Sequence, residues 1–372
     1  MTNAQTGLRV VVAHDYLTQT GGAERVTLAM LQGIPGSRLV TSAYVPEETF
    51  PGFRSHEVSV IPTRGLRVIE RDVRLGLPIL ARAFSSYVVD SQDADVVICS
   101  SSGWAHHITS RVPKLVYCHN PPRWLYQTDD YLSDQGRVAR AAQAVLRRRL
   151  LRQDAAAARS STAYLANSKS VAQRLYAAYG VSSRVLHPPV QLDPKGLLTP
   201  VEGVEPGYFL VVARKRGYKN TSAVMAAAKQ AGVRLVVVGA DIESSSPGIR
   251  SLGRVDDATL RWLYKHARAT VGASFEDFGL TPLESNMFGT PVIALRAGGY
   301  LETVVEGATG IFFDVPDPES IGIAMHRLSH HEFIPADLQG HASAFSTVRF
   351  IEQLTAIAEA LVGAGSTRLS DR

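Results

Sequence analysis

Short runs of apolar residues alternate with segments of helical periodicity along most of the chain. Apolar runs of this kind between helical segments are typical of buried parallel strands, whose two faces are both covered by helices. The pattern therefore predicts an α/β fold. The expected strands are Leu8–Ala13, Asp95–Ser101, Lys114–His119, Ala163–Ala166, Tyr208–Ala213 and Arg234–Gly239.

The segment Leu192–Pro206 divides this pattern into two halves. It is rich in proline and glycine and has almost no periodicity, as expected of a linker. Each half opens with a strand, a loop and a helix. We predict a Rossmann-like domain over residues 1–191 and a second one over residues 192–346, with the strand ends of both facing a central cleft.

A glycine pair follows the first strand. The chain runs into H-D-Y-L-T-Q-T-G-G-A-E-R, so that Gly21 and Gly22 open a helix. The G-x-G-x-x-G pattern is absent, which disfavours NAD as a ligand. The bare backbone of the loop suits a phosphate or a sugar, and a plain tight turn is the alternative.

The most informative stretch is Ser274–Glu284, which reads S-F-E-D-F-G-L-T-P-L-E. We expect a helix to begin at Thr281 or Pro282, because proline suits the first helical turn. Gly279 permits close approach of a ligand. The main-chain N–H groups from Gly279 through Leu280 to Thr281 then offer a phosphate site at a helix N-terminus.

Two carboxylates flank this phosphate site. Glu276 lies on the loop, and Glu284 lies eight residues further on, inside the expected helix. A ligand with both a phosphate and many hydroxyls could use the whole arrangement, and a nucleotide sugar is such a ligand. The alternative is that both glutamates are solvated surface charges.

Other candidates lie at strand ends, where open α/β sheets bind their ligands. His119 ends the strand Lys114–His119, although a lone histidine is often structural. Arg214 and Lys219 follow the strand Tyr208–Ala213 and precede a helix. The two cations can converge on a diphosphate, Arg as a bidentate fork and Lys as a point charge. Solvated surface cations are the alternative.

Composition narrows the class of protein. The 372 residues are 45% apolar and 20% charged, which suits two globular domains. The net charge of +5 indicates an anionic partner, but no nucleic-acid-binding signature occurs, so nucleic acid is disfavoured. We expect no membrane span and no secretory signal. Cys99 and Cys118 have neither disulfide nor metal spacing, and a cytoplasmic location is expected.

Two arginine-rich segments bear on membrane contact. Arg64–Phe84 mixes arginine with apolar residues at helical spacing, and Gly136–Ser160 is expected to form one long helix. Either segment can lie on anionic lipid at the inner face of the cell membrane. An ordinary helix at the surface or packed on the sheet is the favoured alternative for both.

Several of these stretches resemble glycosyltransferase family 4, whose members are retaining enzymes of the GT-B fold. Glu276, Phe278 and Glu284 match the E-x(7)-E signature with its central F-G-L. Arg214 and Lys219 fit the motif G-R-x-x-x-Y-K, with Ala where Gly is usual. The stretch Y-C-H-N-P-P-R-W-L-Y is similar to C-H-T-P-x-R-Y of bacterial polysaccharide mannosyltransferases, with Asn for the commoner Thr.

The resemblance implies a fold and a donor site. It implies the GT-B fold, with the C-terminal helix (residues 347–372) crossing back to the N-terminal domain. It further implies that Glu284 binds the ribose, that Glu276 contacts the transferred sugar, and that His119 faces the reaction centre. The implied donor-binding residues are Gly21, Gly22, Arg214, Lys219, Arg254, Glu276, Phe278, Gly279, Leu280, Thr281 and Glu284.

An acceptor site is expected just after His119. Arg123 lies in the matching turn, and Trp124 and Tyr126 can stack on an acceptor sugar. Core packing is the default for such aromatic residues. Asp129, just beyond, is a weaker candidate for acceptor contact.

We therefore predict a retaining hexosyltransferase. Its catalytic residues are His119, Glu276, Arg214 and Lys219, and the cations stabilise charge that develops on the leaving phosphate. No metal and no cofactor are then required beyond the nucleotide-sugar substrate. GDP-mannose is the favoured donor, since the best-matching stretches look like those of mannosyltransferases. The expected acceptor is a lipid-linked or cell-envelope glycan.

Three alternatives remain open. The first is a transferase that uses a UDP-sugar to move glucose or N-acetylglucosamine. The second is a phosphorylase or nucleotide-sugar epimerase of the same fold, which would need no acceptor glycan. The third is a non-catalytic protein that binds a nucleotide sugar or a membrane.

Overall fold

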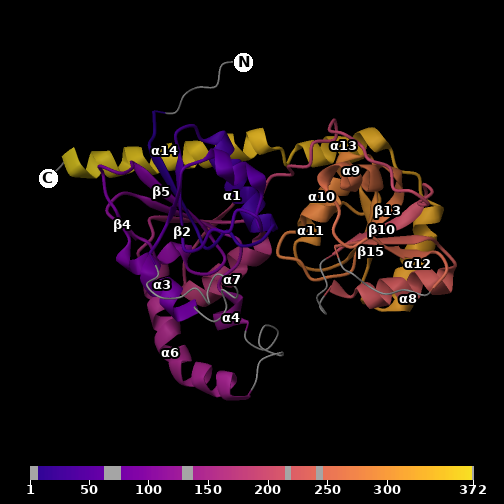
Figure 1. Cartoon of the computed structure of the whole chain (residues 1–372), viewed down its shortest axis with the longest axis horizontal. Coiled ribbons are helices and arrows are strands. Elements are labelled where there is room, and N and C mark those ends of the chain that lie inside the picture. The colour runs from indigo at the N-terminus through magenta and orange to yellow at the C-terminus, as the bar shows by residue number, and fades with distance from the viewer. Residues whose placement is uncertain (1–6, 63–76, 128–136, 214–218, 240–245, 371–372) are drawn as a thin grey trace. The chain divides into compact units, whose positions relative to one another are not determined.

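The computed structural model describes residues 7–62, 77–127, 137–213, 219–239 and 246–370. The chain forms two compact units (Figure 1). The first comprises Met1–Pro189 together with Thr347–Arg372, and the second comprises Val190–Ser346. The division falls two residues before the boundary expected from the linker.

The first unit is built on a parallel sheet. Within the described residues its strand order is β3-β2-β1-β5-β7-β8-β9, and every neighbouring pair runs parallel. A separate pair, β4 and β6, is also parallel. The strands are β1 (Val10–His14), β2 (Arg38–Thr41), β3 (Val58–Val60), β4 (Val88–Val89), β5 (Val96–Ser101), β6 (Thr109–Ser110), β7 (Lys114–Cys118), β8 (Ala163–Ala166) and β9 (Arg184–Val185).

Helices cover both faces of this sheet. Side chains of α3, η3 and α7 pack with one set of strand side chains, and side chains of α1 and α14 pack with the other. The helices are α1 (Gly22–Gly33), η1 (Pro51–Ser55), α3 (Leu77–Ser86), η3 (Ala105–His107), α4 (Arg123–Tyr126), α6 (Arg137–Arg159), α7 (Lys169–Tyr179) and α14 (Thr347–Ser370).

The second unit repeats this plan. Its described strands follow the order β12-β11-β10-β13-β14-β15, again with parallel neighbours throughout. Its strands are β10 (Tyr208–Val212), β11 (Leu235–Val238), β12 (Ile249–Ser251), β13 (Ala267–Gly272), β14 (Val292–Leu295) and β15 (Gly310–Phe313). Its helices are α8 (Thr221–Ala231), α9 (Asp257–His266), α10 (Leu280–Met287), α11 (Tyr300–Thr303), α12 (Pro318–Ser329) and α13 (Pro335–Ser343).

The strand order locates a ligand site in each unit. In both sheets the first strand lies inside the sheet, with later strands added first on one side and then on the other. This is the order of a Rossmann-like domain, in which ligands bind beyond the carboxyl ends of the strands where the order reverses. These switch points lie between β1 and β5 in the first unit and between β10 and β13 in the second.

The two sheets confirm the predicted α/β class, and most expected elements lie within a residue or two of their predicted bounds. Two local differences have physical causes. The helix expected from Thr281 begins one residue earlier, because Gly279 at φ +83° already ends the preceding loop. Pro78 lies in the first turn of α3 and does not interrupt it, since a first turn tolerates proline. Much of the segment Arg64–Phe84 lies outside the described residues.

The C-terminal helix has nearly the extent expected from the sequence. It runs from Thr347 to Ser370 and lies against α1 in the first unit (Figure 1). Phe350, Leu354 and Ala358 enter the core at helical spacing. No described helix is long and apolar enough to cross a membrane.

Both cysteines are buried in the first unit, and they are not joined by a disulfide. Burial raises the pKa of the Cys99 thiol to about 12. Cys99 therefore stays protonated at physiological pH and acts as a small apolar side chain in the core.

Replacing Leu354 with alanine tests whether α14 is an integral part of the first unit. Leu354 is 0% exposed, so Leu354→Ala should lower the free energy of unfolding by about 2–5 kcal/mol. Val348→Ala on the same helix is the control, because Val348 is 66% exposed. Urea denaturation should give a much lower midpoint for the first variant alone. Equal midpoints would contradict the packing described for α14.

Candidate active site

The predicted loop glutamate lies at the switch point of the second unit. Glu276 follows β13, and Lys219 precedes α8 after β10. Their side chains form an ion pair that is mostly buried, with 17% of Lys219 and 21% of Glu276 exposed. Ser274 Oγ donates a second hydrogen bond to the same Glu276 oxygen at 2.5 Å. The structure thus joins a predicted cation and a predicted carboxylate into one polar group.

Asn220 holds the backbone beside Lys219. It is the non-glycine residue with positive φ (50°) among those described, and asparagine tolerates this conformation better than most residues. Its side-chain amide donates to the carbonyl oxygen of Ala273 at 2.7 Å. This bond ties the start of α8 to the end of β13, where Lys219 meets Glu276.

Two glycines shape the loop from the other side. Gly299 N donates to the carbonyl oxygen of Glu276 at 2.9 Å. A Cβ at Gly298 would lie 2.4 Å from that same oxygen, and a Cβ at Gly299 would lie 2.2 Å from main-chain atoms of Phe278. The loop is therefore packed directly against the G-G segment before α11, with no space for a side chain.

The second glutamate is oriented from a neighbouring helix. Glu284 lies in the second turn of α10, and Tyr264 of α9 donates its hydroxyl hydrogen to Glu284 Oε2 at 2.8 Å. Leu280 and Thr281, at the start of α10, are partly exposed. The helix start predicted to bind phosphate and the carboxylate predicted to bind ribose thus lie on one short helix.

The other predicted donor residues of the second unit differ in accessibility. The Phe278 side chain is 3% exposed and packs with Val190 and Leu283, so its donor role stays a prediction. Arg254 is exposed on the loop between β12 and α9. Arg214 lies outside the described residues, so its donor role stays a prediction.

In the first unit, His119 joins a buried hydrogen-bond network. It follows β7 and is 9% exposed. Its Nε2 lies 2.8 Å from Ser100 Oγ, which in turn lies 2.8 Å from Thr27 Oγ1 and 3.2 Å from His14 Nδ1. His14 is the last residue of β1 and pairs with Ser100, the second-last residue of β5. The network therefore spans the switch point of this sheet.

Asp15 completes this edge of the first sheet. It is 1% exposed, and its carboxylate accepts main-chain hydrogen bonds from Ser102 (2.6 Å), Trp104 (2.8 Å) and Ala105 (2.7 Å). These bonds fix the chain as it leaves β5. Sequence reasoning passed over His14 and Asp15, although an H-D pair at the end of a buried strand could have indicated them.

The glycine pair begins α1 as predicted. Gly21 precedes the helix and Gly22 is its first residue. Glu24, in the first turn, is 2% exposed and accepts a hydrogen bond from Gln19 Nε2 at 2.8 Å. The loop thus carries a buried carboxylate next to the predicted phosphate contact. Ligand binding by Gly21 and Gly22 stays a prediction.

The acceptor candidates lie at or near α4. Trp124 is 7% exposed, and Tyr126 packs edge-on against Tyr179 with ring centroids 5.5 Å apart. Both aromatic side chains therefore take part in core packing, which was the default alternative. Arg123 is partly exposed, and Asp129 lies outside the described residues. An acceptor role for these residues stays a prediction.

Comparison with protein families gives the site a context. The model described as Glycosyltransferase Family 4 matches residues 20–194, and the model described as Glycosyl transferases group 1 matches residues 200–342. Each half of the chain thus matches a family model of glycosyltransferases. The two matches correspond closely to the two units of the chain, leaving out its C-terminal helix.

Individual relatives of the chain are glycosyltransferases as well. The chain is 36% identical over 89 residues to a D-inositol 3-phosphate glycosyltransferase of Geodermatophilus obscurus, covering 24% of this chain and 20% of that relative. It is 65% identical over 37 residues to alpha-1,3/1,6-mannosyltransferase ALG2 of Dictyostelium discoideum, covering 10% of this chain and 9% of the relative. The matches thus span about a fifth or less of these relatives' own length.

Solved structures show the fold of this chain. HepE of Anabaena, crystallised with UDP-glucose, superposes with a TM-score of 0.69 at 17% sequence identity. The match covers 95% of this chain and 100% of HepE. The predicted GT-B fold, with two Rossmann-like domains, is thereby confirmed.

Gly299 provides a structural test of the loop packing. Gly299→Ala forces the main chain at Phe278 to move, because the new Cβ would lie 2.2 Å from it. We expect a loss of about 1–3 kcal/mol in the free energy of unfolding. Gly340→Ala is the control: it lies within α13, nothing lies within 4 Å of the added Cβ, and alanine is favoured in helices. Thermal denaturation should separate the two variants, and equal melting temperatures would refute the close packing.

Proposed function

We propose that this protein is a retaining hexosyltransferase that moves mannose from GDP-mannose to a hydroxyl group of a lipid-linked or cell-envelope glycan. The observation that carries the proposal is the polar group at the switch point of the second unit. There Lys219 pairs with Glu276, and Glu284 follows in the second turn of α10. A cation, a helix N-terminus and two carboxylates match the phosphates and hydroxyls of a nucleotide sugar.

Each part of the donor has an assigned partner. Arg214, Lys219 and the main-chain N–H groups at the start of α10 hold the diphosphate, where each charge-assisted hydrogen bond contributes about 1.5–3 kcal/mol. Glu284 binds the ribose hydroxyls in the orientation that Tyr264 maintains. Glu276 contacts the hydroxyls of the transferred sugar.

The Lys219–Glu276 ion pair has a consequence for binding. A phosphate near Lys219 competes with Glu276 for the ammonium group, and the released carboxylate can then accept hydrogen bonds from sugar hydroxyls. Binding of the diphosphate would thus prepare Glu276 for the sugar. Ser274 keeps the carboxylate in place throughout, since it donates to the oxygen that Lys219 contacts.

The proposed transfer uses charge stabilisation rather than a protein nucleophile. As the bond between sugar and phosphate breaks, negative charge grows on the β-phosphate, and hydrogen bonds that strengthen at that moment lower the barrier. The leaving phosphate takes the proton of the acceptor hydroxyl on the same face of the sugar, which retains the configuration. His119 of the first unit is assigned to the transferred sugar. No divalent metal is assigned to the transfer.

The donor preference rests on sequence similarity. The mannosyltransferase-like stretch around His119 and the short match to ALG2, whose name specifies mannose transfer, favour GDP-mannose. The solved complex of HepE with UDP-glucose favours a UDP-sugar, which is the second candidate. We also propose peripheral contact with anionic lipid through the exposed arginines of α6, which include Arg148, Arg149 and Arg152.

Glu284→Ala tests the donor site. Loss of the ribose hydrogen bonds should weaken GDP binding by about 10–100-fold, which is about 1.5–3 kcal/mol, while the fold persists. Isothermal titration calorimetry with GDP measures the affinity, and Arg214→Ala should show a comparable loss. Glu332→Ala, an exposed glutamate of the same unit, is the control. Unchanged GDP affinity in Glu284→Ala would show that Glu284 does not bind the donor.

A donor panel tests the reaction. The protein is incubated separately with GDP-mannose, UDP-glucose and UDP-N-acetylglucosamine. Slow hydrolysis should release nucleotide from one of these donors only, and at the same rate with and without EDTA. We expect that donor to be GDP-mannose. If only UDP is released, the donor is a UDP-sugar and not GDP-mannose. If hydrolysis requires added divalent metal, the assigned mechanism is wrong. GDP binding without hydrolysis of any donor, even with a lipid-linked acceptor added, would favour a binding protein.

A further inference from the structure

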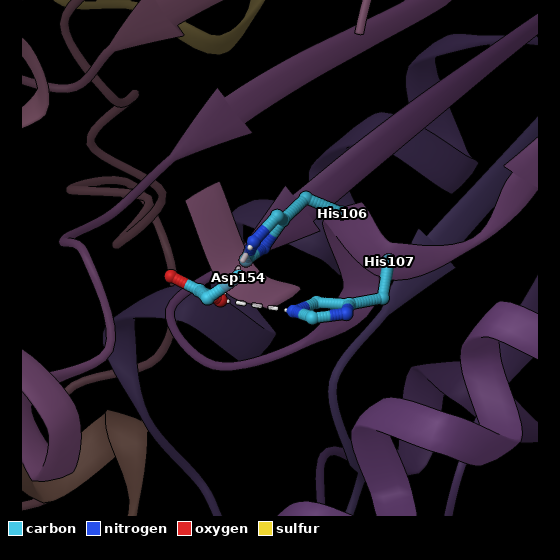
Figure 2. A group of neighbouring side chains, drawn as sticks. All are labelled: His106, His107 and Asp154. Atoms are coloured by element: carbon cyan, nitrogen blue, oxygen red, sulfur yellow. Dashed lines mark hydrogen bonds and ion pairs between the residues drawn. The ribbon is translucent and has the colours of Figure 1, made fainter. Parts of the chain in front are cut away.

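A buried group of two histidines and an aspartate lies in the first unit, apart from the network around His119. His106 and His107 belong to η3, and Asp154 projects from α6 toward them (Figure 2). Their side chains are 3%, 7% and 4% exposed, in that order. His106 Nε2 lies 3.0 Å and His107 Nε2 lies 2.9 Å from the same oxygen, Asp154 Oδ1. One potential ligand atom of each residue therefore points to a common centre.

Neighbouring side chains hold these atoms in position. Tyr179 donates its hydroxyl hydrogen to the other oxygen, Asp154 Oδ2, at 2.8 Å. Ser101 Oγ lies 3.1 Å from His106 Nδ1. Contacts of this kind on the outer atoms of metal ligands fix the tautomer of a histidine and the orientation of a carboxylate. They leave Oδ1 and the two Nε2 atoms facing one another.

Hydrogen bonds alone do not satisfy this group. His107 Nε2 makes a hydrogen bond to Asp154 Oδ1. His106 Nε2 is buried and, among the described residues, makes no hydrogen bond, although it lies 3.0 Å from the same oxygen. A buried nitrogen without a partner loses the full free energy of its solvation. An ion between the three side chains would give this nitrogen a partner.

The chemistry of the three side chains suits metal ligation. Neutral imidazole and ionised carboxylate are the forms that bind metals. The ammonium of Lys114 is nearby but is bonded to the carbonyl oxygens of His106 and Ile108.

We propose that His106, His107 and Asp154 bind a divalent transition-metal ion of the Zn²⁺ class. Imidazole nitrogen and carboxylate oxygen are usual Zn²⁺ ligands at about 2.0–2.2 Å, and two ligands of a tetrahedral ion lie about 3.4 Å apart. The contacts of 2.9 and 3.0 Å are shorter than that spacing, so the side chains would move apart by about half an ångström on binding the ion. The ion would be structural, joining η3 after β5 to the long helix α6. This proposal does not rest on the proposed transfer reaction.

Zn²⁺ titration of the full-length protein tests the site. After brief treatment with EDTA and buffer exchange, wild-type protein should bind one equivalent of Zn²⁺ at micromolar or lower concentration by calorimetry. His107→Gln should weaken this binding at least 100-fold. Co²⁺ should give visible absorption bands with wild type that His107→Gln lacks.

A second histidine pair supplies the matched control. His326 and His330 lie on α12 with ring centroids 4.7 Å apart, so they can hold an ion loosely at the surface. The double variant His326→Gln/His330→Gln should keep the tight site. If this double variant loses Zn²⁺ binding while His107→Gln keeps it, the proposal is wrong. Absence of any Zn²⁺ binding by folded wild type would equally overturn it.

Thermal denaturation separates loss of the ion from loss of the fold. Wild type should melt several degrees lower in EDTA and recover with Zn²⁺. His107→Gln should melt cooperatively at one temperature regardless of EDTA or Zn²⁺. A wild-type melting temperature that EDTA and Zn²⁺ leave unchanged would show that the three side chains form only a hydrogen-bonded group. GDP binding measured in parallel should be the same with and without the ion, so failure of this proposal and failure of the donor site are distinguishable.

Discussion

In both sheets the strands run parallel, and the first strand lies inside the sheet. This topology decides where polar side chains can come together in this protein. A parallel sheet directs all its strands to one edge, and helices cover both of its faces. Where the strand order reverses, successive connections leave toward opposite faces and expose the strand ends. His14 and Ser100 occupy that position in the first unit. The Lys219–Glu276 ion pair occupies the corresponding position in the second.

Polar groups at these buried edges require partners, and the surrounding elements supply them. An unpaired carboxylate or imidazole in such a place would be strongly destabilising. Asp15 accepts three main-chain N–H groups, and Glu284 accepts the hydroxyl of Tyr264. These contacts hold the side chains in fixed positions before any ligand arrives. The glycines before α11 serve the same purpose, because only a residue without a side chain lets that segment hold the Glu276 loop.

Local features of the site were accessible from sequence, and contacts across the fold were not. The spacing of Glu276 and Glu284, the loop between them and the helix that follows are all encoded within a few turns of chain. Lys219 and Glu276 are 57 residues apart in sequence, so their pairing depends on β10 and β13 being neighbours. For the aromatic residues after His119, residue type alone gave an expectation that packing in the fold did not follow. Their type suggested sugar stacking, but neighbours distant in sequence bury Trp124 and pack Tyr126 against Tyr179.

The sequence by itself determined the α/β class, the two halves, most strand and helix positions, and the signature that identifies the family. Periodicity, glycine and proline act over a few residues, so these features are visible in a linear pattern. The tertiary structure decided the strand order, the packing of the C-terminal helix on the first unit, and the partners of each buried polar side chain. His106 and His107 meet Asp154 only because η3 and α6, nearly fifty residues apart, pack together. Such contacts follow from sheet order and helix packing, which no local pattern specifies.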